Sequence, residues 1–269
     1  MNCKVTGTES KGGAIYFRDN VTKSVINGCN FTNCSAIGDI AFGGAIYWIC
    51  DNGSVSGCSF VGCNASKGGA IYFGTNSSVN YCIFENNNAR NGSAIYVAYS
   101  SVDVDFNFFG FQNNITKFPN GLVEGAHPNN WVVLEITASG DSYFVNFITN
   151  DYNTLDDNMP DYTARLSING ATKDILIKNN NYSDTFIPGN YVLTSLNSGN
   201  ILENKTFRVH PDIPVIDDRD KDNNKDKDNN RDKDNGNRVN NSVKNMENCG
   251  TPLIALLIAL ISLPLIRRK

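Results

Sequence analysis

Histidine and closely spaced carboxylates are scarce in this chain of 269 residues, and that scarcity argues against an enzyme. Its two histidines, His127 and His210, have no serine or cysteine nucleophile motif near them. The first 110 residues hold seven acidic residues, of which only Asp103 and Asp105 share a strand face closely. Polysaccharide lyases and hydrolases need clustered carboxylates with a base or a calcium ion. We therefore expect no catalytic residues.

Basic stripes and metal-binding motifs are also missing. The formal net charge is −4 and the pI is about 5.2, so we expect no nucleic-acid partner, because such partners need a basic surface. No CxxC pair or Cys/His cluster has the spacing of a zinc site. Asn230, Asp232 and Asp234 alternate as in an EF-hand calcium loop, but Asn235 holds the turn position and Asn241 holds the twelfth. We expect no metal ion and no cofactor.

Helical periodicity is absent from the first 110 residues, which instead repeat themselves. The phrase Gly-Gly-Ala-Ile-Tyr at 12–16 returns at 43–47 and 68–72, and with Ser93 at 92–96, at intervals of 31, 25 and 24 residues. Between these copies, a second phrase pairs short β-type runs with Gly, Asn and Ser turns. A fixed period of this length indicates one unit stacked on copies of itself. We predict an all-β chain that begins with a right-handed parallel β-helix solenoid, whose turns lie about 4.8 Å apart.

Strand alternation assigns the repeated side chains to two faces. The apolar set is expected inside the coil and comprises Ile15, Ile46, Ile71 and Ile95 with Phe17, Trp48, Phe73 and Val97. The residues between them then point outward, and they are the tyrosines Tyr16, Tyr47, Tyr72 and Tyr96.

Cysteines form two columns, Cys3, Cys34 and Cys63, then Cys29, Cys58 and Cys82. The second column shares its parity with Phe31, Phe60 and Phe84, so we expect it to be buried. Neighbours one turn apart are within disulfide range, but parallel Cβ vectors rarely allow the required torsion. Because cysteine also packs well as a small apolar residue, we favour stacked thiols over disulfides.

The chain starts inside a turn of the solenoid, since Asn2-Cys3 aligns with Asn33-Cys34. We expect an N-terminally truncated solenoid, or a first turn that a partner covers.

Composition divides the chain into five segments: β-helix repeats at 1–112, a connector at 113–127, an immunoglobulin-like β-sandwich at 128–211, a disordered charged linker at 212–248 and a membrane anchor at 249–269. The sandwich is predicted from seven short strand-like runs at 131–137, 143–149, 162–169, 173–178, 183–187, 191–196 and 205–209.

The anchor is an apolar run at 253–266 that ends in three basic residues. Counted from Cys249, it covers about 27 Å as a helix, close to the thickness of a bilayer core. The basic end favours the cytoplasmic side, which places the rest of the chain outside the cell. A buried core helix and later cleavage of the tail are the alternatives.

Asparagine is abundant, with 41 residues and eleven Asn-x-Ser/Thr sequons. In an exported chain these sequons could carry glycans, although an Asn- and Ser-rich turn repertoire explains them equally well. The candidates for glycosylation are Asn20, Asn52, Asn76, Asn114, Asn181 and Asn204.

The repeats resemble those of the polymorphic outer-membrane proteins of chlamydiae, whose two marks are Gly-Gly-Ala-Ile and Phe-x-x-Asn. The first mark is intact at Gly12, Gly43 and Gly68, and among the three copies of the second phrase the second mark is intact only at 84–87. Together with a sandwich, a polar linker and a basic-ended anchor, the solenoid resembles adhesin-like surface proteins of methanogenic archaea. That resemblance implies an architecture and a place at the cell surface, but it does not identify a ligand.

We therefore expect a cell-surface, membrane-anchored adhesin-like protein that binds glycans or proteins of neighbouring or host cells. The outward tyrosine ladder is the expected ligand-binding surface, because aromatic side chains suit sugars and protein partners. A ladder that only supports the sheet is the alternative for those four residues. For the whole chain, the alternatives are a structural envelope spacer without a ligand and a degenerate polysaccharide lyase or hydrolase.

Overall fold

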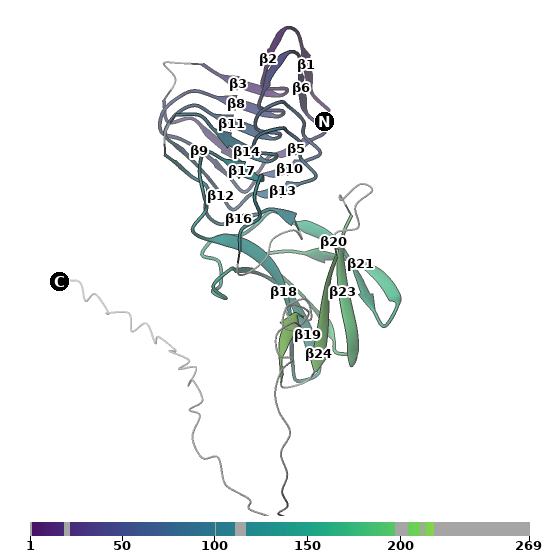
Figure 1. The fold of residues 1–269 in the computed structure, drawn as a ribbon. Helices are drawn as coiled ribbons and strands as arrows, with labels where there is room; N and C mark the ends of the chain where they lie inside the picture. Colours follow the sequence, from purple (N-terminus) through teal and green to yellow (C-terminus); the bar gives the residue numbers. More distant parts are fainter. Residues whose placement is uncertain are drawn as a thin grey trace, which may run out of the picture. The chain divides into compact units, whose positions relative to one another are not determined.

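The computed structural model describes residues 2–18, 22–99, 101–110 and 117–196, together with the backbone of two later strands, β24 (Asn204–His210) and β25 (Ile213–Asp217). The described part is all-β and begins with a β-solenoid of about four turns (Figure 1). This confirms the predicted repeat fold.

Three parallel sheets run along the solenoid, and each turn adds one strand to each sheet. The first, here called the tyrosine sheet, contains β3 (Ile15–Phe17), β8 (Ile46–Trp48), β11 (Ile71–Phe73), β14 (Ile95–Val97) and β17 (Val123–Glu124). The second contains β4 (Val25–Asn27), β9 (Gly53–Ser56), β12 (Ser77–Asn80) and β15 (Val102–Asp103). The third contains β5 (Asn30–Thr32), β10 (Ser59–Val61), β13 (Ile83–Glu85) and β16 (Asn107–Phe108) before it continues beyond the solenoid. Equivalent residues of successive repeats pair in register. β17, which lies within the predicted connector, pairs with β14 and adds a fifth strand to the tyrosine sheet.

The two glycines of each repeat have different roles. The first has a left-handed backbone in every copy, with φ between 59° and 65° at Gly12, Gly43, Gly68 and Gly92. The second lies against the next turn, where a Cβ on Gly44 would stand 2.1 Å from the carbonyl oxygen of Gly69. The last copy has Ser93 at this position, and its N–H donates to the carbonyl oxygen of Gly121 in the next turn at 2.8 Å.

The longer first interval comes from a spur that leaves the coil at two successive turns (Figure 1). The spur consists of β1 (Lys4–Thr6), β2 (Glu9–Lys11), β6 (Ser35–Ile37) and β7 (Ile40–Phe42). β1 pairs with β6 and β2 pairs with β7, both in parallel. In the later turns, isolated β-bridges at Asn64 and Lys67 stand in place of the spur.

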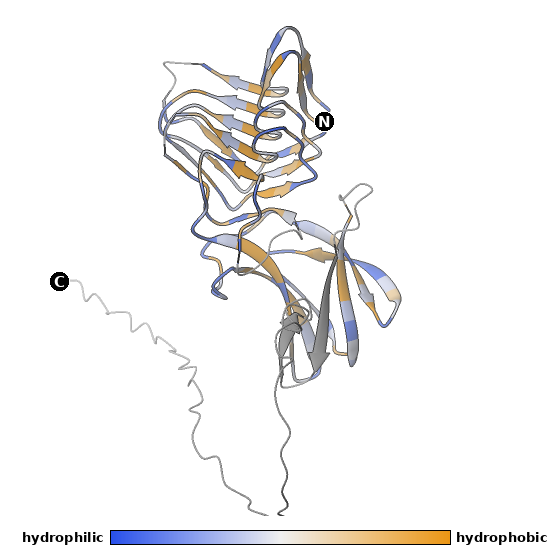
Figure 2. Ribbon diagram, in the orientation of Figure 1, coloured by the Kyte–Doolittle hydropathy of each residue, from blue (hydrophilic) through white to orange (hydrophobic). Residues whose placement is uncertain are grey.

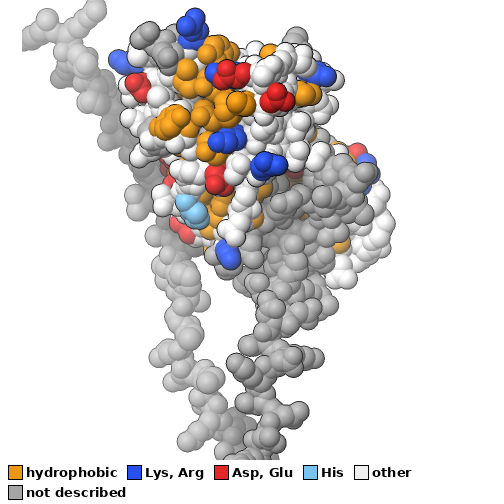
Figure 3. All heavy atoms as spheres, turned by 45° about the horizontal axis from the view of Figure 1, so that its top comes forward, with side chains coloured by type: hydrophobic (Ala, Val, Ile, Leu, Met, Phe, Trp, Pro, Cys, Tyr) orange, Lys and Arg blue, Asp and Glu red, His pale blue; other side chains and the backbone are white. Residues whose placement is uncertain are grey.

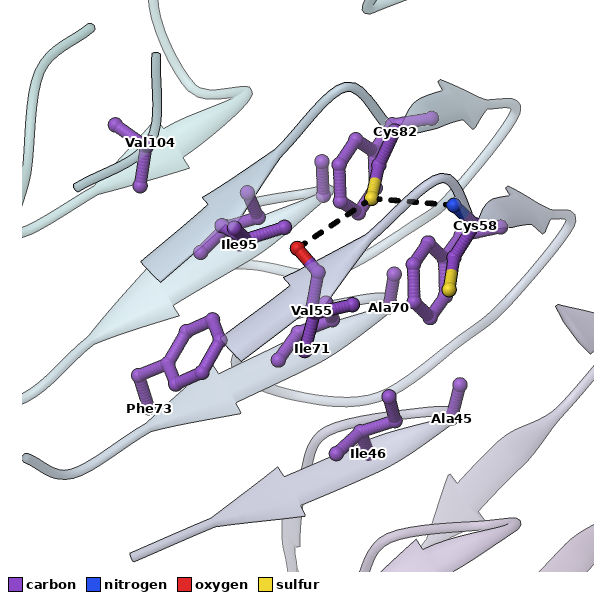
Figure 4. Close-up of a cluster of buried hydrophobic side chains, with 14 of the residues drawn as sticks. Ala45, Ile46, Val55, Cys58, Ala70, Ile71, Phe73, Cys82, Ile95 and Val104 are labelled. Atoms are coloured by element: carbon purple, nitrogen blue, oxygen red, sulfur yellow. Dashed lines mark hydrogen bonds between the residues drawn. The ribbon is translucent and has the colours of Figure 1, made fainter. Parts of the chain in front are cut away.

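The predicted inward face is confirmed. Ile46, Ile71 and Ile95 are fully buried, as are Trp48 and Phe73, and Figure 4 shows several of these side chains stacked inside the coil. Ile15 and Phe17 belong to the first described turn and are only partly buried. Apolar and polar residues alternate along the short strands (Figure 2), which is the pattern from which the faces were predicted.

Beyond the solenoid, the third sheet continues without a break. β18 (Trp131–Ser139) pairs in parallel with β16, and β19 (Ser142–Thr149) and β22 (Asn181–Thr185) extend it. A second sheet contains β20 (Tyr162–Ile168), β21 (Ala171–Ile177), β23 (Gly189–Ser195), β24 and β25. Side chains from both sheets share one apolar cluster, with Leu134, Val145, Leu166 and Leu193 among them.

Each of the seven strand-like runs expected after residue 130 overlaps one of these strands. β25 falls within the segment expected to be a disordered linker, where Ile213, Val215 and Ile216 give the chain enough apolar character for a strand. In the described part of the chain, no helix is long and apolar enough to cross a membrane. The predicted anchor at 249–269 and the linker after β25 lie outside the described residues.

Candidate binding face

The four predicted tyrosines form one continuous stack on the outer face of the tyrosine sheet. Ring centroids are 5.2 Å apart between Tyr16 and Tyr47, 5.0 Å between Tyr47 and Tyr72, and 5.4 Å between Tyr72 and Tyr96. The ring planes differ by only 14° to 20°. The in-register strands therefore place the rings face to face at the spacing of the turns.

The ladder points outward, as expected, but its middle is covered. Tyr16 is 45% exposed, whereas Tyr47 and Tyr72 are each only 7% exposed. Phe42, at the base of the spur, packs against both middle rings, with centroids 6.1 Å from Tyr47 and 4.8 Å from Tyr72. The faces of the middle rings are thus occupied by protein, and they are not free platforms for a sugar.

Three of the four hydroxyl groups of the ladder remain available. Those of Tyr16, Tyr72 and Tyr96 have no hydrogen-bond partner among the described residues. The one fully buried side-chain oxygen or nitrogen without a partner in this part of the chain is the Tyr143 hydroxyl. The Tyr72 hydroxyl therefore reaches the surface, although its ring is covered. Burial of the ring, with a smaller contribution from Tyr47, raises the pKa of Tyr72 to about 12.

Lysine side chains lie against the ladder on the side of the spur. Lys11 Nζ stands 5.3 Å from the ring centroid of Tyr47, and Lys67 Nζ stands 4.9 Å from that of Tyr96 and 5.9 Å from that of Phe42. Ammonium groups at these distances are attracted to the ring faces. Figure 3 shows Lys and Arg side chains close to a hydrophobic patch on this end of the solenoid.

One exposed aromatic residue escaped the sequence prediction. Tyr99 is 86% exposed and follows β14 two residues after its end. It lies near enough to Tyr72 to contribute to the raised pKa of that residue. No repeat signal marks Tyr99, because the earlier turns have Cys50 and Thr75 at the corresponding place.

All seven described cysteines are free thiols. In the second column two sulfurs accept a hydrogen bond from the previous turn: Cys29 N–H donates to Cys58 Sγ and Cys58 N–H to Cys82 Sγ, both at 3.4 Å (Figure 4 shows the second). Asn107 continues the column, since Cys82 N–H donates to its Oδ1 at 2.9 Å. Burial raises the pKa of the Cys82 thiol.

Cys29 contradicts the prediction that its whole column is buried. It is exposed, whereas Cys58 and Cys82 are fully buried. The reason is its place in the first described turn, since β5 ends its sheet and no described strand stacks on the other side.

The remaining candidate residues have ordinary surroundings. Asn52, Asn76 and Asn181 are exposed, although Asn181 Nδ2 donates to Asn146 Oδ1 at 2.6 Å, and the side chains of Asn20, Asn114 and Asn204 lie outside the described residues. The carboxylates of Asp103 and Asp105 accept backbone hydrogen bonds, at 3.0 Å from Asp105 N–H and 2.7 Å from Asn129 N–H. Within the described residues, no group of three or more His, Cys, Asp or Glu side chains could hold a metal ion.

Comparison with protein-family models, with curated proteins and with solved structures found no match.

Proposed function

We propose that this chain is a cell-surface adhesin-like protein that displays its solenoid to bind glycans or proteins of other cells. In this proposal, the second β-region is an immunoglobulin-like sandwich, and a charged linker joins it to a C-terminal membrane helix at 249–269. The right-handed coil and the resemblance to adhesin-like surface proteins of methanogenic archaea belong to the same proposal.

The observation that carries it is a face of the solenoid with exposed aromatic side chains near its two ends and lysines beside it. Tyr16 and Tyr99 are exposed aromatic residues at opposite ends of the ladder, at 45% and 86%. Aromatic rings with a polar tip bind sugars and protein partners through both parts of the side chain.

Binding of the full-length chain, in detergent, to a glycan array and to whole cells would test this. The informative variant is the double substitution Tyr16→Ala and Tyr99→Ala, because both side chains are exposed and their loss leaves the core intact. Tyr152→Ala is the matched control, since Tyr152 is also exposed, at 66%, but lies in the second β-region. We expect saturable binding that the double variant loses and the control keeps.

The second candidate is a structural envelope spacer, and the covered middle of the ladder favours it. Rings that stack on each other and on Phe42 stabilise the sheet without any ligand. If the folded protein binds no glycan and no cell, the spacer is the better description.

A further inference from the structure

Lys67 is a cation whose surroundings are aromatic instead of acidic. Its Nζ lies between the rings of Tyr96 and Phe42, at 4.9 and 5.9 Å from their centroids. Among the described residues it forms no ion pair and no side-chain hydrogen bond. Its three N–H donors are therefore free to meet an anion.

Lys67 belongs to a column that runs beside the tyrosine ladder. The in-register partners are Lys11, Phe42, Lys67 and Asn91, one from each successive turn. Lys11 and Lys67 are two turns apart, which is about 10 Å along the axis. Arg90 is exposed and lies next to Lys67, where its backbone N–H donates to the carbonyl of Ser66.

The two columns have the period of a linear sugar polymer. The hydroxyls of the ladder repeat with the ring spacing of 5.0 to 5.4 Å. One sugar of an extended pyranose chain is about as long as one turn of the solenoid is high. A polymer lying along the axis would therefore pass the hydroxyls of Tyr16, Tyr72 and Tyr96 at intervals of whole sugars, and a lysine at every second sugar.

We propose that this face binds a linear acidic polysaccharide that lies parallel to the solenoid axis, with its carboxylate or sulfate groups at Lys67 and Lys11. The inference rests on the proposed adhesin function and names the class of its ligand. Hydrogen bonds between charged partners are stronger than neutral ones, so the cations provide the selectivity for an acidic chain. The ladder hydroxyls provide the contacts with the neutral sugar hydroxyls.

The charges around this face leave it with a local excess of cations, although the chain as a whole is acidic. Glu9 pairs with Lys11 at 2.7 Å and shares that lysine with any ligand. Glu124, on β17, is exposed beside Tyr96 and marks the end of the ladder. Among the described residues, Lys67 and Arg90 form no ion pair, and they provide the remaining positive charge.

Calorimetric titration of the full-length chain in detergent tests the inference with two matched pairs of probes. The first pair is oligogalacturonate and its methyl ester, which differ in the charge of each carboxyl group and by the methyl group that neutralises it. The second is a sulfated galactan and its desulfated form, which separates sulfate from carboxylate as the preferred group. We expect the acidic member of at least one pair to bind about tenfold or more tightly than its neutral counterpart, and salt to weaken that binding.

Lys67→Gln should weaken acidic binding by about tenfold and leave the neutral probes unchanged, whereas Lys67→Arg should retain most of it. Lys178→Gln makes the same charge change on the second β-region, next to Asp161, and should have no effect. Equal binding of neutral and acidic probes would overturn the inference, even if a variant failed to fold. If neutral probes bind as well as acidic ones and the Tyr16/Tyr99 variant abolishes that binding, the proposed adhesin function stands and only the inference of an acidic ligand is wrong. If no acidic probe binds, the inference is wrong.

Discussion

The Tyr162 hydroxyl donates a hydrogen bond of 2.6 Å to Glu85 Oε1, across 77 residues of sequence. The Ser195 hydroxyl donates to the same oxygen at 2.9 Å. Glu85 ends β13 of the solenoid, whereas Tyr162 and Ser195 lie on β20 and β23 of the second sheet. One buried carboxylate thus joins the solenoid to the β-region that follows it, in addition to the continuous third sheet.

Tyr162→Phe should lower the free energy of unfolding by about 1 to 3 kcal/mol, because it keeps the ring in its cluster but removes a donor from a buried carboxylate. Urea unfolding followed by tryptophan fluorescence measures the change. Tyr182→Phe is the control, since that hydroxyl donates to the exposed Asp184 at 3.1 Å and its loss should cost under about 0.5 kcal/mol. Equal stability of Tyr162→Phe and the unsubstituted chain would show that the bond contributes nothing.

Asn107 supports the last turn of the solenoid through three buried hydrogen bonds. Its Oδ1 accepts from Cys82 N–H at 2.9 Å, and its Nδ2 donates to the carbonyls of Val79 and Val104 at 2.7 and 2.8 Å. Asn107→Ala leaves these backbone groups unpaired and should cost roughly 3 kcal/mol by urea unfolding. Asn76→Ala, at an exposed asparagine, should cost under about 0.5 kcal/mol. Similar costs for the two variants would contradict this account.

The same column shows what the sequence could predict and what it could not. The positions of Cys29, Cys58 and Cys82 followed from repetition, because strand pairing in register is a property of the repeat itself. The sequence did not show that a thiol accepts the same hydrogen bond in this column that Asn107 accepts in the last turn. The same substitution explains the imperfect Phe-x-x-Asn mark: Asn87 Oδ1 accepts from Cys63 N–H at 2.9 Å, and Cys63 itself stands where an asparagine would stand one turn earlier.

Contacts between segments far apart in the chain could not be predicted from the sequence. The alternation of Ile and Tyr fixed which side chains point outward, but not that Phe42 of the spur would cover the middle tyrosines. The length of the first interval was visible, although nothing local showed that the additional residues form paired strands. Glu85 had no repeat partner of its own kind, so its bonds to Tyr162 and Ser195 gave no signal.

Gly44→Ala should destabilise the solenoid severely, by more than about 3 kcal/mol, because the new Cβ would lie 2.1 Å from the carbonyl oxygen of Gly69. The turns cannot move apart to relieve this clash without breaking the backbone hydrogen bonds between them. Ser93→Gly, the reciprocal change in the last copy, should alter stability by about 1 kcal/mol or less. Thermal unfolding of both variants measures the contrast. A stable Gly44→Ala protein would mean that the turns can shift apart locally.

Tyr72 should make the solenoid sensitive to alkaline pH. Its pKa is about 12 in the folded protein against about 10 for an ordinary tyrosine, so the folded state holds the proton more tightly. The stabilisation is complete below pH 10 and is lost as the pH rises toward 12, because the unfolded chain ionises first. Since the hydroxyl reaches solvent, we expect a loss of roughly 0.5 to 1 kcal/mol between pH 9 and pH 11.

Urea unfolding at the two pH values, compared between the unsubstituted chain and Tyr72→Phe, isolates this contribution from the other groups that titrate in the same range. The phenylalanine variant keeps the stacked ring and should lose stability less steeply with pH. Tyr152→Phe, at an exposed position in the second β-region, is the matched control. If Tyr72→Phe and the unsubstituted chain have the same slope, the middle of the ladder is as well solvated as the surface. Its ring faces would then be open to ligands, which would favour direct stacking of sugars on the ladder over the hydroxyl and lysine contacts inferred above.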